Sequence, residues 1–191
     1  MRVVYMGTPD FAVDSLLSIS KIHDIVGVFT QPDKLVGRKQ ILTPPETKVL
    51  AEKYNIPVFQ PNTLKDDEVF EALKNLKPDL IVVVAYGKLL PKRVLDLPKY
   101  GCINVHASIL PKYRGASPIQ WSIVTDAKET GVTTMLMDEG MDTGDIISKR
   151  EVVIEDEDEH HWHQIHHDLH TWHLLLTCIL LLHGVPCVQD V

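Results

Sequence analysis

The 191-residue chain is poor in features that define several classes of protein. It has three cysteines, Cys102, Cys178 and Cys187, whose spacing fits no metal-ligand pattern and whose odd number argues against a disulfide framework. Such cysteine usage is typical of a reducing compartment, so we expect a cytoplasmic protein with no bound metal.

Long apolar runs are also missing. The longest, from Leu174 to Leu182, is interrupted by Thr177 and falls far short of the roughly 20 residues that a membrane helix needs. The first residues, Met1 to Tyr5, lack the apolar stretch of a signal peptide and lead directly into a turn. We therefore expect a soluble protein without membrane contact.

An excess of positive charge is absent as well. The formal net charge of −7 argues against a protein that wraps nucleic acid, although a local basic patch remains compatible with it. The composition, 45% hydrophobic and 24% charged, is that of an ordinary globular protein able to bury a core. The length favours one domain.

Apolar runs and helical patterns alternate along the first hundred residues. We expect strands at 2–6, 24–30, 58–59 and 79–86, and helices after Phe11, at 46–54 and at 66–76. The run at 79–86 (DLIVVVAY) is almost wholly apolar, which is typical of a strand buried on both faces of a parallel sheet. The pattern predicts an α/β fold with a Rossmann-like, open, mostly parallel sheet and helices on both faces.

The second half has a different pattern. We expect strands at 102–108, 131–137 and 146–154 and a helix at 117–125. The last two strands are close in sequence, so they should pair in an antiparallel or irregular way and make the sheet mixed. The chain shows no internal repeat or linker. We divide it into a Rossmann-like half (1–100), a segment that carries the chemistry (101–154) and a distinct tail (155–191).

A glycine turn, Gly7-Thr8-Pro9-Asp10, follows the first strand and opens a helix. Dinucleotide sites occur in this setting, but the three-glycine fingerprint is missing. A tight strand-to-helix turn is the favoured interpretation, and no nicotinamide cofactor is expected.

Asn104 and His106 lie two residues apart on an expected strand, so their side chains point to the same side. Open α/β sheets bind ligands beside the carboxyl ends of their strands. From the residues alone, a structural pair that caps a loop is as good an interpretation as a catalytic pair. Leu110-Pro111 and Arg114-Gly115 then enforce a turned loop that can pack against a flat ligand.

The segment Met137–Asp145 contains two glycines and four acids. It lacks the ligand spacing of an EF-hand calcium loop, and a solvated turn is its simplest interpretation. A more specific hypothesis is that this turn carries Asp142 toward Asn104 and His106.

These segments together give the chain its resemblance to a known family. The motifs are MGTPDFAV, VFTQPDK, VVVAYGKLLP, GCINVHASILPKYRGASPIQW and ETGVTTMLMDEGMDTGDI. From its first residue to about Ile154, the chain resembles the methionyl-tRNA formyltransferases within the folate-dependent formyltransferase family. The resemblance implies that a formyl group passes from 10-formyltetrahydrofolate to the amino group of methionyl initiator tRNA through a tetrahedral intermediate.

By the same resemblance, Asn104, His106 and Asp142 are the catalytic set. Amide and imidazole donors suit the charge that develops on the formyl oxygen, and Asp142 beside His106 suits proton relay. The resemblance further implies that tetrahydrofolate binds the loop formed by Ser108, Ile109, Leu110 and Pro111, in which Ile109 replaces a more usual leucine. No metal is required, and Ser108 lies in no nucleophile motif.

The segment 31–48 carries Lys34, Arg38, Lys39 and Lys48. The resemblance implies that this loop contacts the acceptor end of the tRNA, while a mobile solvated loop is an equally open interpretation. Phosphate contacts would be salt-sensitive. Gln40 and Ile41 stand where relatives often have more basic residues.

Two other functions share the same residues. An enzyme that formylates a nucleotide-linked amino sugar would use the same Asn-His-Asp set, and a non-catalytic folate-binding α/β module would keep the fold without turnover. The resemblance implies a C-terminal β-barrel domain that helps to hold the tRNA in relatives, and we expect the present sequence to stop before such a domain. The expected partners are folate and initiator methionyl-tRNA, and the expected state is a monomer.

The tail departs from the family. It holds most of the histidines in the chain, His160, His161, His163, His166, His167, His170, His173 and His183. Pairs four residues apart, such as His163 and His167, could chelate a transition metal on a helix. A helix that packs Trp162 and Leu169 inward, with an anomalous histidine-rich surface, is the favoured interpretation.

Overall fold

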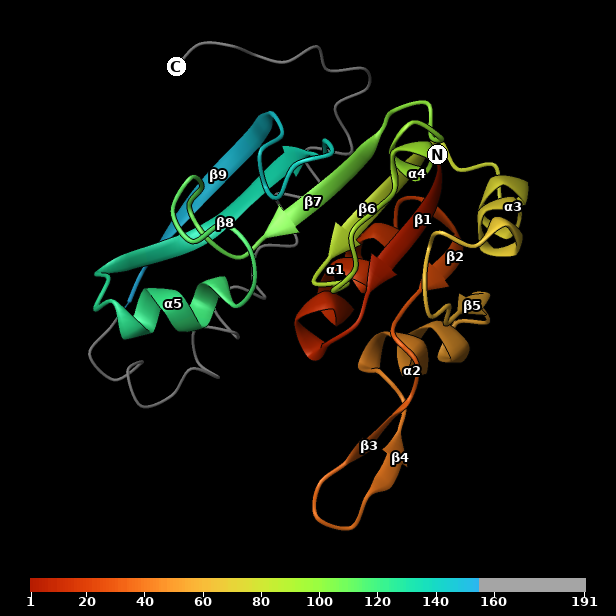
Figure 1. The fold of residues 1–191 in the computed structure, drawn as a ribbon, viewed down its shortest axis with the longest axis horizontal. Helices are drawn as coiled ribbons and strands as arrows, with labels where there is room; N and C mark the ends of the chain where they lie inside the picture. The colour runs from red at the N-terminus through yellow and green to blue at the C-terminus, as the bar shows by residue number, and fades with distance from the viewer. Residues whose placement is uncertain (155–191) are drawn as a thin grey trace. The chain divides into compact units, whose positions relative to one another are not determined.

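The fold is that of a computed structural model, which describes residues 1–154 (Figure 1). The chain divides into two compact units, Met1–Ile103 and Asn104–Val191, and the boundary falls within the strand β7 (Cys102–His106). The expected helix and histidine pairs of the tail lie outside the described residues.

The first unit alternates strands and helices. Its strands are β1 (Arg2–Gly7), β2 (Asp24–Phe29), β3 (Lys34–Val36), β4 (Ile41–Thr43), β5 (Val58–Phe59) and β6 (Leu80–Val84). Its helices are the 3-10 turn η1 (Asp10–Ala12), α1 (Val13–Ser20), α2 (Glu46–Lys53), α3 (Asp67–Asn75) and α4 (Lys92–Leu95). This order is the strand–helix alternation that the sequence predicts.

A parallel sheet in the order β5-β2-β1-β6 forms the centre of the first unit. Residues Val3–Met6 of β1 and Leu80–Val84 of β6 are buried, as expected for strands covered on both faces. The strand β6 ends at Val84, two residues before the expected end, because Ala85 adopts a left-handed backbone with φ 47°.

The helices of the first unit contribute to the same core. Leu16 and Ile19 of α1 and Leu73 of α3 are buried, and α2 packs against α1, β2 and β5. The α2 residue Thr47 is buried, and its hydroxyl donates to the carbonyl of Gly7 over 3.0 Å. This bond joins the start of α2 to the turn after β1.

Gly7 is required by close packing at that turn. A Cβ there would lie 2.7 Å from the Tyr5 ring, 2.9 Å from Ala12 Cβ and 3.0 Å from the Val84 carbonyl oxygen. Contacts below 3.0 Å cannot be accommodated without a shift of the neighbours. The glycine is therefore explained by a tight strand-to-helix connection.

The segment expected to be a loop contains a hairpin. Lys34–Val36 (β3) pairs antiparallel with Ile41–Thr43 (β4), and every residue of both strands is exposed. Three-residue strands that bury nothing show no alternation of apolar and polar residues, so the sequence carries no signal for them. The β3–β4 hairpin projects from the rest of the first unit (Figure 1).

The described part of the second unit contains α5 (Pro118–Val124), β8 (Glu129–Leu136) and β9 (Ile146–Val153). The strands β8 and β9 pair antiparallel, and α5 packs against β8. At Gly131 of β8, a Cβ would lie 1.9 Å from the Arg150 carbonyl oxygen and 2.5 Å from Ile109 Cδ1. Only glycine fits between β9 and the loop that carries Ile109.

The predicted fold class is confirmed. It is a Rossmann-like α/β fold whose pairing is parallel in the first unit and antiparallel between β8 and β9, hence mixed. Within residues 1–154, no helix is long and apolar enough to cross a membrane.

Candidate active site

The strand β7 carries the two residues that the sequence singles out, Asn104 at its middle and His106 at its end. Asn104 is half-buried and His106 is buried, and both side chains contact the same carboxylate, that of Asp142. The Asn104 amide donates to Asp142 Oδ1 over 3.3 Å, which leaves the second N–H of the amide for another acceptor. His106 Nδ1 lies 3.6 Å from Asp142 Oδ2.

Asp142 comes from the turn between β8 and β9. Its backbone is left-handed, with φ 52°, a conformation in which Asp and Asn are tolerated better than most residues. The Gly115 amide donates to Asp142 Oδ2 over 2.8 Å, so the carboxylate also joins the loop after β7 to the β8–β9 turn. The structure therefore brings together the three residues of the expected catalytic set.

Both ring nitrogens of His106 face oxygen acceptors. Nε2 is 2.9 Å from the carbonyl oxygen of Tyr113, and Nδ1 faces the Asp142 carboxylate. A neutral imidazole donates from one nitrogen only, whereas an imidazolium donates from both.

The loop of Ser108, Ile109, Leu110 and Pro111 is held by residues of the two following strands. Thr133 of β8 donates to the Ser108 carbonyl over 2.7 Å and accepts from the Leu110 amide over 3.0 Å. Lys149 of β9 donates to the Leu110 carbonyl over 2.6 Å. Thr133 and Lys149 stand opposite each other in the β8–β9 register.

Thr133 and Lys149 were missed by the sequence analysis. Neither residue lies in a sequence motif that indicates a chemical role. Both bond to the same loop because the β8–β9 register places them side by side, and only the structure gives that register. Ser108 itself donates its hydroxyl to the Lys112 carbonyl over 2.7 Å, which is a structural bond within the loop.

The described cysteine, Cys102, offers no nucleophile. It is buried, and burial raises the pKa of its thiol to about 12. A thiol with that pKa is essentially all protonated at neutral pH and therefore unreactive. Among residues 1–154, no group of three or more His, Cys, Asp or Glu side chains is arranged to hold a metal ion.

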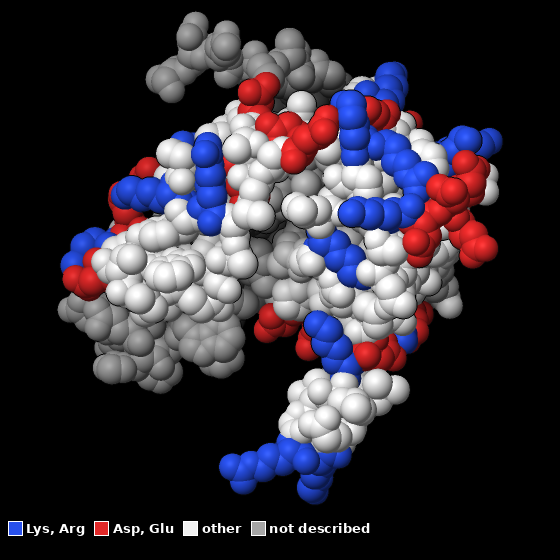
Figure 2. All heavy atoms as spheres, viewed as in Figure 1, with Lys and Arg blue, Asp and Glu red and all other residues white. Residues whose placement is uncertain are grey.

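The basic residues expected to contact tRNA belong to the first unit and fall into two environments. Lys34, Arg38 and Lys39 are exposed on the β3–β4 hairpin, and Figure 2 shows basic side chains gathered at its tip. Lys48 lies on α2, where its ammonium is bonded to Asp33 and Gln60. The structure thus separates Lys48 from the other three.

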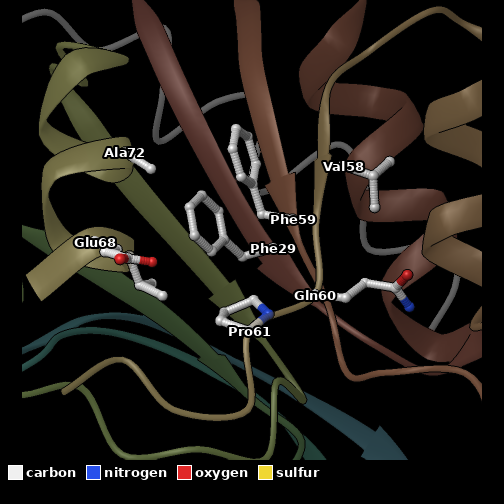
Figure 3. Close-up of a pocket in the computed structure, with 8 residues that line it drawn as sticks. Phe29, Val58, Phe59, Gln60, Pro61, Glu68 and Ala72 are labelled. Carbon is white, nitrogen blue, oxygen red and sulfur yellow. The ribbon is translucent and has the colours of Figure 1, made fainter. Parts of the chain in front are cut away.

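The first unit also contains a mostly apolar pocket of about 360 Å³ between α3 and the strands β2 and β5 (Figure 3). The rings of Phe29 and Phe59 stack there with centroids 4.7 Å apart. None of the residues that line the pocket belongs to the expected sites.

Comparison with known proteins relates this geometry to a family. Residues 1–177 match the model of the formyl transferase family. The chain belongs to this family. It is 62% identical to a methionyl-tRNA formyltransferase of Alkaliphilus oremlandii over 157 residues, which are 81% of this chain and 50% of the relative. A methionyl-tRNA formyltransferase of Pelotomaculum thermopropionicum is 57% identical over 159 residues, 83% of this chain and 51% of the relative.

This formyl transferase chain thus spans about half the length of the curated relatives it matches. Among solved structures, it is similar to a phosphoribosylglycinamide formyltransferase from Bacillus halodurans, with a TM-score of 0.77 and 26% identity. That likeness covers 99% of this chain and 100% of the other. Family membership and fold therefore agree.

Proposed function

We propose that this chain carries the catalytic site of a methionyl-tRNA formyltransferase. It would transfer the formyl group of 10-formyltetrahydrofolate to the amino group of methionine on initiator tRNA. The observation that carries the proposal is the contact of Asn104 and His106 with one carboxylate, Asp142, in a chain 62% identical to a methionyl-tRNA formyltransferase over 157 residues.

The reaction asks three things of the site. The amine nitrogen attacks the formyl carbon, negative charge develops on the formyl oxygen, and the bond between that carbon and the folate nitrogen breaks. The attacking amine loses a proton and the leaving nitrogen gains one. The net change moves one formyl group and one proton, and neither substrate is oxidised or reduced.

Asn104 and His106 are suited to stabilise the formyl oxygen. The free N–H of the Asn104 amide supplies one donor. In our proposal, the second donor is His106 Nε2, which exchanges its bond to the Tyr113 carbonyl for a bond to the formyl oxygen when the donor binds. Asp142 contacts both side chains and so fixes where their donors lie.

The loop Ser108–Pro111 would receive the folate. Thr133 and Lys149 already engage the Ser108 carbonyl and both backbone polar groups of Leu110. Ile109 is half-buried and Pro111 is exposed, so their apolar side chains are the parts of the loop suited to pack on a flat ring.

The exposed Lys34, Arg38 and Lys39 of the hairpin would contact phosphates of the tRNA. Such contacts are strong at low salt and weaken as counterions compete, and the hairpin places its charges in full contact with solvent. They are compatible with the overall charge of −7 because they form a local patch.

An acceptor panel tests the proposed function. The chain is incubated with 10-formyltetrahydrofolate and, in separate reactions, methionyl initiator tRNA, a nucleotide-linked amino sugar and phosphoribosylglycinamide. We expect formylation of the tRNA alone, and its loss in His106→Ala. Preferred formylation of the amino sugar would assign the chain to that reaction instead. Folate binding without turnover of any acceptor would identify a non-catalytic binding module.

A further inference from the structure

Three polar side chains meet beside the base of the β3–β4 hairpin. Lys48 Nζ lies 2.9 Å from each carboxylate oxygen of Asp33 and 3.0 Å from Gln60 Oε1. The Gln60 amide donates to Asp33 Oδ1 over 2.7 Å and to the Gln31 carbonyl over 2.9 Å. We call Asp33, Lys48 and Gln60 the base cluster.

The hydrogen-bonding capacity of the Lys48 and Gln60 nitrogens is used within this cluster and by the neighbouring Gln31 carbonyl. An ammonium has three N–H groups, and Lys48 has three oxygen partners; an amide has two, and Gln60 has two partners. The Lys48 side chain is only 19% exposed. A contact from Lys48 to a phosphate would therefore require one of these bonds to break.

The cluster joins the two ends of the hairpin to the parallel sheet. Asp33 directly precedes β3, and Lys48 lies in the first turn of α2, which follows β4. Gln60 directly follows the edge strand β5. Figure 3 shows the Gln60 side chain pointing away from the stacked rings of Phe29 and Phe59, while Gln60 is itself among the residues that line the pocket.

The hairpin has little else to set its direction. Its strands pair only with each other among the described residues, and none of their residues is buried. A two-stranded ribbon without a buried face has no independent stability. Its direction must therefore be set where it joins the rest of the first unit.

We propose that the base cluster is a positioning device for the RNA substrate: Asp33, Lys48 and Gln60 fix the hairpin so that Lys34, Arg38 and Lys39 reach the phosphates together. This inference rests on the proposed function of the chain. It gives Lys48 a role through Asp33, in place of the direct tRNA contact that its charge suggested. A fixed hairpin binds RNA more tightly because less conformational entropy is lost on binding.

The substitution Asp33→Asn distinguishes a positioning role from a purely electrostatic one, because the two predict opposite changes in RNA binding. Removing a carboxylate from a basic region strengthens RNA binding if only electrostatics acts. In the positioning model the same substitution weakens the bond to Lys48, so the KM for methionyl-tRNA rises severalfold. The turnover number at saturating RNA and the KM for the formyl donor should stay within about twofold of the parent, since neither depends on the hairpin.

Lys48→Met and Lys48→Arg complete the kinetic test. Lys48→Met should raise the KM for RNA as Asp33→Asn does, with an unchanged dependence of binding on salt. Lys48→Arg keeps a donor to Asp33 and should restore part of the affinity. If Lys48 instead contacts a phosphate, Lys48→Met lowers the slope of log K against log salt by about 1, and Asp33→Asn tightens binding. Either of these two results overturns the proposal.

A structural measurement separates failure of this inference from failure of the proposed function. Spin labels at Gln40→Cys and Asn75→Cys, with Cys178 and Cys187 replaced by serine, report the distance from hairpin tip to α3 without RNA. We expect a narrow distribution in the parent and a broad one in Asp33→Asn and Lys48→Met. Lys74→Met, which removes the exposed pair with Glu71, is the matched control and should leave the distribution narrow. Unchanged distributions in all variants reject the positioning role, whatever the activity assays show.

Discussion

Buried polar side chains are distributed unequally between the two units. In the first unit they are Thr30 and Thr47; in the described part of the second they are His106, Ser108, Ser122, Thr130, Thr133 and Thr134. The first unit instead buries the apolar strands β1 and β6. The first unit is thus stabilised mainly by removing apolar surface from water, while in the second the buried His106, Ser108, Ser122 and Thr133 make directed hydrogen bonds.

This difference separates two tasks within one chain. Apolar burial is non-directional and tolerates small shifts, so it suits a scaffold. Hydrogen bonds have narrow limits of distance and angle, so they suit side chains that must meet a reacting group. The contacts of Asp142 with Asn104, His106 and Gly115 belong to the second kind.

The strongest test of the comparison is to remove apolar volume from the first unit. Leu73 is fully buried on α3, so Leu73→Ala should lower the free energy of unfolding by about 2–5 kcal/mol. Leu42 on the hairpin is 62% exposed, and Leu42→Ala should have a much smaller effect. Urea unfolding of both variants measures the two changes in the free energy of unfolding. Equal losses would contradict the assignment of the first unit as a scaffold built on burial.

Substitutions at the candidate active site should lower the turnover number more than they lower the stability of the fold. We expect His106→Ala and Asp142→Asn to lower kcat at least about a hundredfold, as the loss of a positioned acid–base group does. Asn104→Ala should raise the barrier by roughly 3 kcal/mol through loss of one oxyanion donor. Single-turnover formyl transfer measures all three. Near-normal rates throughout would refute the mechanism.

Thr133 tests whether the hydrogen bonds of the second unit organise the loop. Thr133→Val keeps the shape but leaves the Leu110 amide and the Ser108 carbonyl without their partner, at a cost of about 1–3 kcal/mol for each unsatisfied group. Thr133→Ser retains the hydroxyl and serves as the control. We expect the valine variant alone to lose stability and to show a higher KM for the formyl donor.

The smallest expected effect is a pH dependence in the base cluster. Hydrogen bonds from Gln60 and Lys48 hold the pKa of Asp33 below its ordinary value. Because the folded pKa is lower than the unfolded one, the contribution to stability is complete above the unfolded value, near pH 4, and is lost as the pH falls through the folded value. Thermal unfolding between about pH 2 and 6 should therefore fall less steeply toward acid in Asp33→Asn than in the parent. Identical slopes would contradict this contribution.

The sequence predicts the scaffold better than the site because burial leaves a pattern and hydrogen bonds do not. The apolar runs of β1 and β6 mark them as buried strands, and the strands were expected within one or two residues of their observed ends. The β3–β4 hairpin was missed because its exposed strands have no such pattern. The sequence offered the meeting of Asn104, His106 and Asp142 as one hypothesis beside a solvated turn, and the family resemblance favoured it.

Charge alone is a poor guide to the role of a basic residue. Lys48 was grouped with Lys34, Arg38 and Lys39 because all four are basic and lie in the segment 31–48, which the family resemblance assigns to the tRNA contact. The bonds from Lys48 to Asp33 and Gln60 depend on the strand β5, which brings Gln60 to the hairpin base. Likewise, Thr133 and Lys149 act on one loop only because the β8–β9 register makes them neighbours.

The exposed hairpin also has a consequence for solubility. Leu35, Val36, Ile41 and Leu42 are each more than half exposed, on a two-stranded ribbon whose outer edges pair with nothing among the described residues. Open strand edges with apolar side chains favour aggregation, and charged residues beside them oppose it. Lys34, Arg38 and Lys39 are charged residues of this kind, because they lie on the hairpin beside the exposed apolar side chains. A variant stripped of all three charges would tend to self-associate, and its failure to bind RNA would then have two causes. Single substitutions keep enough charge on the hairpin to tell those causes apart.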